Sequence, residues 1–135
     1  GGLNRELRTI IDRLSNLNTA SIYIPADLPL LTEDDIDNAI DDSNGGEVIT
    51  LCPDNRMEGT NGLVIPPTTS FRPSLGNKSL SRHLRRAKMH KDQYVIHKSE
   101  GWGIDLDSPK DLESVMTRQT GFEDRMFVFE KNRPR

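Results

Sequence analysis

Apolar residues recur at steps of three and four positions at the start of the chain, as Leu7, Ile11 and Leu14 illustrate. This spacing predicts an amphipathic helix, because it places the apolar side chains on one face. A second helix is predicted after Thr32, which can cap it together with Asp35 three residues further on. The predicted helices are residues 4–17, 33–41, 79–90 and 108–116, the last beginning at Ser108-Pro109.

Short runs of β-branched and aromatic residues lie between these helices and predict buried strands. The predicted strands are residues 21–26, 47–51, 63–65, 94–96, 103–107 and 126–129. Alternating strands and helices are typical of a layered α/β domain. Ligands of open α/β sheets bind beyond the carboxyl ends of the strands, so polar residues at those positions are candidates for function.

Composition narrows the class of protein. The chain has 135 residues, a net charge of −3 and one cysteine, Cys52. One domain fits this length. The lone cysteine excludes an internal disulfide and a cysteine-based zinc site, and the balanced charge does not point to a nucleic acid or a membrane surface. No apolar run approaches the roughly 18 residues of a membrane span, and no signal peptide is recognised, so we expect a cytoplasmic protein.

Three carboxylates are candidates for binding a metal ion. Asp105 and Asp107 are two residues apart in a predicted strand, which would place both side chains on the same face. Asp27 follows another predicted strand and could supply a third oxygen ligand. Three carboxylates with open positions suit Mg²⁺. The alternative is that Asp107 only begins a helix, that Asp105 is a surface charge and that Asp27 forms a turn before Pro29.

Two glycine-bearing segments are candidates for binding phosphate: Gly59–Gly62, and Gly76–Ser79 before a predicted helix. Glycine lets the backbone approach a ligand, and the N–H groups of a helix N-terminus favour an anion. Ser79 is predicted to cap the helix and to contact the phosphate. The alternative is that both segments are ordinary turns.

Other residues have plainer interpretations. The basic run from Lys78 to Lys91 could attract phosphorylated ligands, but it is interpreted as a solvated helix face. His83 within it is interpreted as structural, Cys52 as a core residue and Trp102 as packing over a loop.

Five motifs, in this order along the chain, resemble the phospholactate guanylyltransferases, which prepare the side chain of the deazaflavin coenzyme F-420. The motifs are G-L-N-R-E-L (2–7), A-D-L-P-L-L (26–31), G-T-N-G-L (59–63), G-N-K-S-L-S-R-H (76–83) and I-D-L-D-S-P-K-D-L (104–112).

The resemblance implies a Rossmann-like nucleotidyltransferase fold of the nucleotide-diphospho-sugar transferase type. It also implies transfer of GMP from GTP to a small phosphorylated acid: 2-phospho-L-lactate, phosphoenolpyruvate or 3-phosphoglycerate. By matching motif positions, Asp27, Asp105 and Asp107 would hold Mg²⁺. The residues expected to hold the acid are Thr60, Asn61, Gly76 and Ser79. No general base is assigned, because a phosphate nucleophile is already ionised at neutral pH.

The sequence departs from the family at Gly62, where alanine is usual, and at Asn77, Lys78 and Leu80. The family also begins with a strand and a basic loop for the guanine nucleotide. Nothing in this chain resembles that loop, so we expect about 60 upstream residues and little turnover by this chain alone. Residues 1–117 would be the C-terminal portion of the domain, and residues 118–135 a tail with an extra strand.

Alternative functions remain at this point. They are a molybdopterin or sugar-phosphate nucleotidyltransferase of the same fold, and a non-catalytic module derived from it. Nucleic-acid binding through residues 78–91 is disfavoured, because the basic run lacks aromatic residues for stacking. A homodimer is compatible with the sequence, with the strand at 126–129 pairing with a partner's edge.

Overall fold

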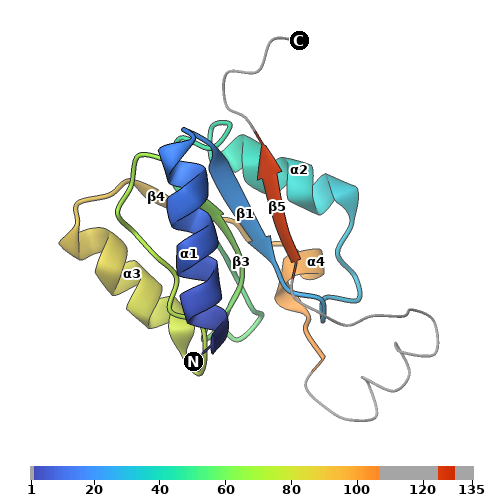
Figure 1. The fold of residues 1–135 in the computed structure, drawn as a ribbon. Coiled ribbons are helices and arrows are strands. Elements are labelled where there is room, and N and C mark those ends of the chain that lie inside the picture. The colour runs from blue at the N-terminus through green and yellow to red at the C-terminus, as the bar shows by residue number, and fades with distance from the viewer. Residues whose placement is uncertain (1, 107–124, 130–135) are drawn as a thin grey trace.

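The computed structural model describes residues 2–106 and 125–129 and folds them into helices around one sheet (Figure 1). The helices are α1 (Gly2–Asn16), α2 (Glu33–Asp42), α3 (Ser79–Met89) and α4 (Glu100–Gly103). The strands are β1 (Ala20–Ile24), β2 (Ile49–Pro53), β3 (Thr60–Ile65), β4 (Tyr94–Ile96) and β5 (Arg125–Phe129). The α/β class is therefore confirmed. The helix predicted at 108–116 lies outside the described residues.

The sheet has the strand order β4-β2-β3-β1-β5. Strand β4 runs parallel to β2, and the other neighbouring pairs are antiparallel. Because β3 runs against β1 and β2, its first residues lie beside the last residues of its two neighbours; Thr60 pairs with Pro53. The start of β3 and the ends of β1 and β2 therefore meet at one edge of the sheet.

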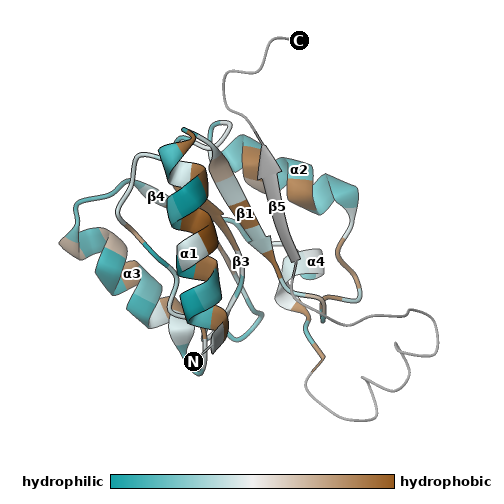
Figure 2. Ribbon diagram, viewed as in Figure 1, coloured by the Kyte–Doolittle hydropathy of each residue, from teal (hydrophilic) through white to brown (hydrophobic). Residues whose placement is uncertain are grey.

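Helices cover both faces of the sheet (Figure 1). Helices α1 and α3 pack on one face through Leu7, Ile11 and Leu80, and α2 and α4 pack on the other through Ala39 and Trp102. On the longer helices, the hydrophobic residues lie mainly on the side that faces the sheet, and the hydrophilic residues lie mainly on the outer side (Figure 2). The buried apolar residues thus form two cores, one on each face of the sheet, and these cores position the loops at the sheet edge.

The capping prediction for α2 is confirmed. The Thr32 hydroxyl accepts a hydrogen bond from the Asp35 N–H at 3.2 Å, and the Asp35 carboxylate accepts one from the Thr32 N–H at 2.9 Å. This reciprocal pair satisfies two backbone donors that would otherwise have no partner at the helix start. The capping box therefore fixes the point at which the loop after β1 ends and α2 begins.

The strand predicted over 103–107 is wrong. Residues 100–103 form the short helix α4, and residues 104–106 have no regular structure. The reason is Trp102, which is fully buried rather than lying over a loop. Its Nε1–H donates to the Asp35 carbonyl at 3.0 Å, and the Ser99 hydroxyl accepts from its backbone N–H.

The strand character predicted at 126–129 is confirmed, and pairing of this strand with a partner's edge stays a prediction. Strand β5 pairs along the whole of β1 within the same chain, from Ala20 opposite Phe129 to Ile24 opposite Arg125. Strand β1 therefore has a neighbour on both edges.

None of the helices in the described part of the chain has the length and the apolar character that a membrane span requires.

Candidate phosphoacid and metal site

A cavity of about 460 Å³ lies at the sheet edge where β1 and β2 end and β3 begins. Its size is in the range of small-molecule sites. Six of the seven predicted site residues line it: Asp27, Thr60, Asn61, Gly76, Ser79 and Asp105. The seventh, Asp107, lies outside the described residues. Segments that are 78 residues apart in the sequence, from Asp27 to Asp105, thus meet at one cavity.

Thr60 and Ser79 are joined by two hydrogen bonds at the wall of this cavity. The Thr60 backbone N–H donates to the Ser79 hydroxyl at 3.0 Å, and the two hydroxyl oxygens are 3.2 Å apart. Both residues are buried. Lys78, in the left-handed conformation, is the N-cap of α3, so the prediction that Ser79 caps this helix is wrong. Ser79 instead fastens the start of β3 to the start of α3.

His83 extends this network into the core. Its Nδ1 lies 2.7 Å from the Thr60 hydroxyl oxygen, and its Nε2 accepts a hydrogen bond from the Ser74 N–H at 2.9 Å. An Nε2 that accepts carries no proton, so in the neutral ring the proton is on Nδ1, which donates to Thr60. The interpretation of His83 as structural fits these contacts, but sequence reasoning missed its direct bond to Thr60.

Burial keeps the His83 ring neutral. The side chain is fully buried and packs 5.6 Å, between ring centroids, from Phe71. Loss of hydration, followed by the positive charges of Arg82 and Arg86, lowers the pKa of His83 from 6.5 to about 4. The neutral ring therefore persists across the physiological pH range.

Asn61 is held from the opposite side of β3. Its side-chain amide donates to the Trp102 carbonyl at 2.8 Å. The Trp102 ring lies against Gly62, where an added Cβ would be 2.7 Å from the ring atom Cε3. Glycine at position 62, where the resembling family usually has alanine, is therefore explained by the volume that Trp102 occupies.

The far wall of the cavity is formed by residues 75–78. Gly76 has a φ of +133°, a conformation that strongly favours glycine. Leu75 is clamped from α1: the Asn4 side chain donates to the Leu75 carbonyl at 3.1 Å and accepts from its N–H at 2.8 Å. Asn4 belongs to the first of the five motifs, and this clamp is its structural role.

Asp27 and Asp105 are brought together by the backbone. The Leu106 N–H donates to the Asp27 carbonyl at 3.2 Å, so the segment that carries Asp105 runs beside the end of β1. Among residues 2–106 and 125–129, no group of three or more His, Cys, Asp or Glu side chains is arranged to hold a metal ion. Since Asp107 falls outside those ranges, the three-carboxylate ligand set stays a prediction.

Two cationic residues line the cavity, Arg56 and Lys78. Sequence reasoning missed Arg56, which lies in the loop between β2 and β3 and which no motif signal marks. Lys78 lies within the segment Gly76–Ser79 that was predicted to bind phosphate. The lining also includes four carboxylates, those of Asp27, Asp54, Glu58 and Asp105.

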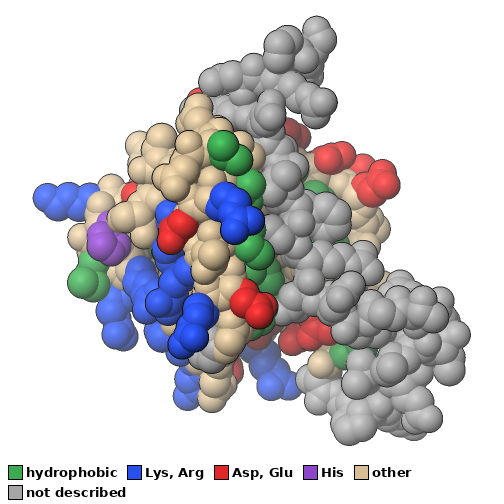
Figure 3. Space-filling model, in the orientation of Figure 1, with side chains coloured by type: hydrophobic (Ala, Val, Ile, Leu, Met, Phe, Trp, Pro, Cys, Tyr) green, Lys and Arg blue, Asp and Glu red, His purple; other side chains and the backbone are tan. Residues whose placement is uncertain are grey.

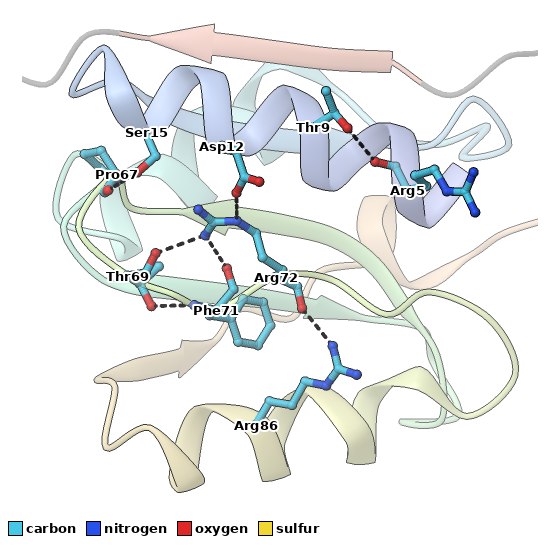
Figure 4. A network of polar contacts seen from close by, with 9 residues as sticks. All are labelled: Arg5, Thr9, Asp12, Ser15, Pro67, Thr69, Phe71, Arg72 and Arg86. Atoms are coloured by element: carbon cyan, nitrogen blue, oxygen red, sulfur yellow. Dashed lines mark hydrogen bonds and ion pairs between the residues drawn. The ribbon is translucent and has the colours of Figure 1, made fainter. Parts of the chain in front are cut away.

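A second cavity, of about 520 Å³, shares no lining residue with the first. Five arginines line it, and several Lys and Arg side chains are visible on the face that carries α1 and α3 (Figure 3). One of them, Arg72, pairs with Asp12 at 2.7 Å and donates to the Thr69 and Phe71 carbonyls, while Arg86 donates to the Arg72 carbonyl (Figure 4). Half of the basic run is therefore arranged in a cleft, not simply on a solvated helix face.

Comparison with known proteins gives a consistent result. The family model described as "Guanylyl transferase CofC like" matches residues 2–130. A 2-phospho-L-lactate guanylyltransferase of Methanopyrus kandleri is 38% identical over 89 residues, which are 66% of this chain and 46% of that protein. A phosphoenolpyruvate guanylyltransferase of Sphaerobacter thermophilus is 32% identical over 115 residues, 84% of this chain and 55% of that protein. The chain thus spans about half the length of the curated relatives it matches.

Proposed function

Because the chain belongs to the family of CofC-like guanylyl transferases, we propose that it provides the acceptor half of a guanylyltransferase active site. The enzyme would transfer GMP from GTP to a small phosphorylated acid, 2-phospho-L-lactate, phosphoenolpyruvate or 3-phosphoglycerate, in coenzyme F-420 biosynthesis. The sheet with helices on both faces would then be part of a Rossmann-like nucleotidyltransferase fold of the nucleotide-diphospho-sugar transferase type.

One observation carries this proposal: every predicted site residue that the structure describes lines the same 460 Å³ cavity. Donors from Thr60, Ser79 and Lys78 lie on its lining together with the carboxylates of Asp27 and Asp105. Hydroxyl, backbone and ammonium donors suit the oxygens of a phosphorylated acid. The carboxylates suit a divalent cation instead, so the lining offers partners for both groups.

The donor set also fits Mg²⁺. Four carboxylates against two cationic side chains would repel an acid with several negative charges unless a cation offset them. Asp27 and Asp105 would hold the ion with oxygen ligands, which Mg²⁺ prefers. When bound, Mg²⁺ would neutralise charge on the phosphates of the substrates.

The chemistry needs positioning more than proton transfer. A phosphate oxygen of the acid would attack the α-phosphorus of GTP, a new P–O bond would form, and the bond from that phosphorus to the bridging oxygen would break, releasing diphosphate. The attacking phosphate is mostly ionised at neutral pH, since its second pKa is about 6. The role of Thr60, Ser79 and the backbone around Gly76 would be to orient the acid for in-line attack.

Calorimetry with the three phosphoacids, with and without MgCl₂, tests this assignment. We expect binding that requires Mg²⁺, is abolished by EDTA and weakens at least tenfold in Asp27→Asn and Asp105→Asn. Asp34→Asn is a matched control, because Asp34 is an exposed carboxylate in the first turn of α2 and does not line the cavity. Guanylyl transfer is followed in parallel as diphosphate release from GTP.

Two outcomes would overturn the proposal. The acceptor assignment fails if none of the three acids binds in the presence of Mg²⁺. The metal assignment fails if Asp27→Asn and Asp105→Asn bind the acids in the presence of Mg²⁺ as tightly as Asp34→Asn does.

A further inference from the structure

The hydrogen-bond inventory at Thr60, Ser79 and His83 leaves one hydroxyl proton unused. His83 Nδ1–H donates to the Thr60 oxygen, and the Thr60 N–H donates to the Ser79 oxygen. The bond between the two hydroxyls uses one of their two protons, whichever of them donates. Among the described residues, no acceptor is found for the other proton, and both residues line the cavity.

When the Ser79 hydroxyl donates to Thr60, the Thr60 oxygen accepts two hydrogen bonds, one from Ser79 and one from His83. Both lone pairs of that oxygen are then occupied, and the Thr60 hydroxyl can act only as a donor. His83 itself cannot reverse its bond, because the Ser74 N–H fixes the other ring nitrogen as an acceptor. The directions of the bonds from Ser74 to His83 and from His83 to Thr60 are thus set in the core.

We propose that His83 is a positioning residue for substrate, which fixes Thr60 as a donor-only contact for an anionic oxygen of the phosphoacid. This inference rests on the proposed function and deepens it. The ligand class it selects is an acid whose phosphate or carboxylate oxygen accepts a hydrogen bond at this point. A ligand that presents only N–H donors here, such as an ammonium group or an amide nitrogen, would place two donors against each other and be rejected.

The physical advantage is preorganisation. A threonine hydroxyl at an exposed site rotates and offers either a proton or a lone pair. Here its orientation is fixed by bonds buried in the core, so less rotational freedom is lost when the acid binds. The same ring also holds the Ser74 backbone, two residues from Gly76 in the opposite cavity wall.

Two substitutions separate these two roles of the ring. His83→Asn places an amide donor near the position of Nδ1 and loses the acceptor for Ser74. His83→Gln places an amide oxygen near the position of Nε2 and loses the donor to Thr60. We expect the dissociation constant of the phosphoacid, measured by calorimetry with Mg²⁺, to stay within about threefold of wild type in His83→Asn and to rise about 10- to 100-fold in His83→Gln, as expected for a lost hydrogen bond to a charged group.

A double-mutant cycle with Thr60→Val tests the coupling directly. If His83 acts through the Thr60 hydroxyl, His83→Gln should weaken acid binding little further once that hydroxyl is gone. Additive losses would mean that His83 only supports the fold, and would overturn the inference. Melting temperatures of all variants establish that each one folds.

The ring tautomer is measured independently of activity, by ¹⁵N NMR of the imidazole in the wild-type chain. A neutral ring protonated on Nδ1 supports the inference, and protonation on Nε2 overturns it whether or not an acid binds. Failure of the proposed function has a different signature, namely that wild-type protein binds no phosphoacid with Mg²⁺, in which case the role of Thr60 toward an acid falls too. If wild type binds the acid and His83→Gln binds it equally well, only the His83 inference is lost.

Discussion

His83 shows how a single buried side chain can set the chemistry of a surface cavity. The ring accepts from Ser74 and donates to Thr60. A protonated ring could still donate to Thr60, but it could not accept from Ser74, because two N–H donors would then face each other. Burial keeps the ring neutral, so the bond directions at the cavity depend on the core behind it. Polar groups that are buried and fully bonded in this way restrict the site to one arrangement.

The low pKa of His83 makes stability depend on pH. The unfolded chain takes up the proton near pH 6.5, whereas the folded chain takes it up only near pH 4. His83 therefore lowers the free energy of unfolding as the pH falls from about 6.5 to about 4, by about 3 kcal/mol in total, and changes nothing outside that window. Urea unfolding of wild type and His83→Gln at pH 7 and at about pH 4.5 separates the contribution of His83 from that of the carboxylates, because both proteins contain the same carboxylates. If the free energy of unfolding changes with pH equally in both proteins, His83 makes no such contribution.

Gly62 is the residue at which the packing of Trp102 is most sensitive to volume. A methyl group there would overlap the buried ring, so Gly62→Ala should lower the free energy of unfolding by about 1–3 kcal/mol. Gly2→Ala is the matched control, because nothing lies within 4 Å of a Cβ at that position. Thermal and urea unfolding measure both. In a Trp102→Leu background, where the indole ring is replaced by a smaller side chain, Gly62→Ala should lower the free energy of unfolding by less. If Gly62→Ala is as stable as wild type, the proposed overlap with the ring is refuted.

At the scale of elements, the two longer helices that follow strands begin differently. Helix α2 has a complete capping box from Thr32 and Asp35. Helix α3 begins at Lys78 in the left-handed conformation without a side-chain cap, and the Leu80 N–H donates to the Glu58 carbonyl instead. The start of α3 is thus fastened to the loop before β3, which places an incompletely capped helix end at the cavity where an anion is proposed to bind.

The cap of α2 gives a prediction at this scale. Thr32→Ala removes the hydroxyl that accepts from the Asp35 N–H, and should lower the free energy of unfolding by about 1 kcal/mol. Thr32→Ser keeps an oxygen in the same place and should change it little. Both are measured by urea unfolding, and acid binding should remain as in wild type, because Thr32 does not line the cavity. Equal stability of the two variants would contradict the capping role.

For the whole molecule, the important feature is a sheet whose middle strands deliver polar residues to one edge. Strand β3 runs antiparallel to β1 and β2. The first residues of β3 therefore lie beside the residues that follow the ends of β1 and β2. Strand β5 completes the sheet by covering the second edge of β1. The tail at 118–135 therefore supplies a structural strand to the domain.

Removing that strand should expose an edge that can pair with another chain. A variant ending at residue 117 is expected to self-associate, measured as a rise in the weight-average mass in sedimentation experiments over a range of concentrations. A variant ending at Phe129 keeps the strand and is the matched control. If the two variants sediment alike, pairing of β5 with β1 does not protect the sheet edge.

Much of the local structure was predictable from the sequence, because it depends on neighbours within a few residues. The apolar spacing around Leu7 and Ile11 predicts α1, the Thr32–Asp35 pair predicts the start of α2, and the motifs name six residues that line one cavity. The segment 103–107 was predicted wrongly as a strand because its short apolar run carries no information about where Trp102 will be buried. Local spacing cannot represent a contact with Gly62, 40 residues earlier.

The sequence by itself determined most of the elements and the family, and it predicted the residues that are proposed to hold a phosphoacid and a cation. Only the tertiary structure decided that Ser79 fastens β3 instead of capping α3, that Asn4 clamps Leu75, and that His83 donates to Thr60. The physical reason is that a hydrogen bond's direction depends on which groups share the buried space. That is set by packing between segments far apart in the chain, and no spacing along the sequence encodes it.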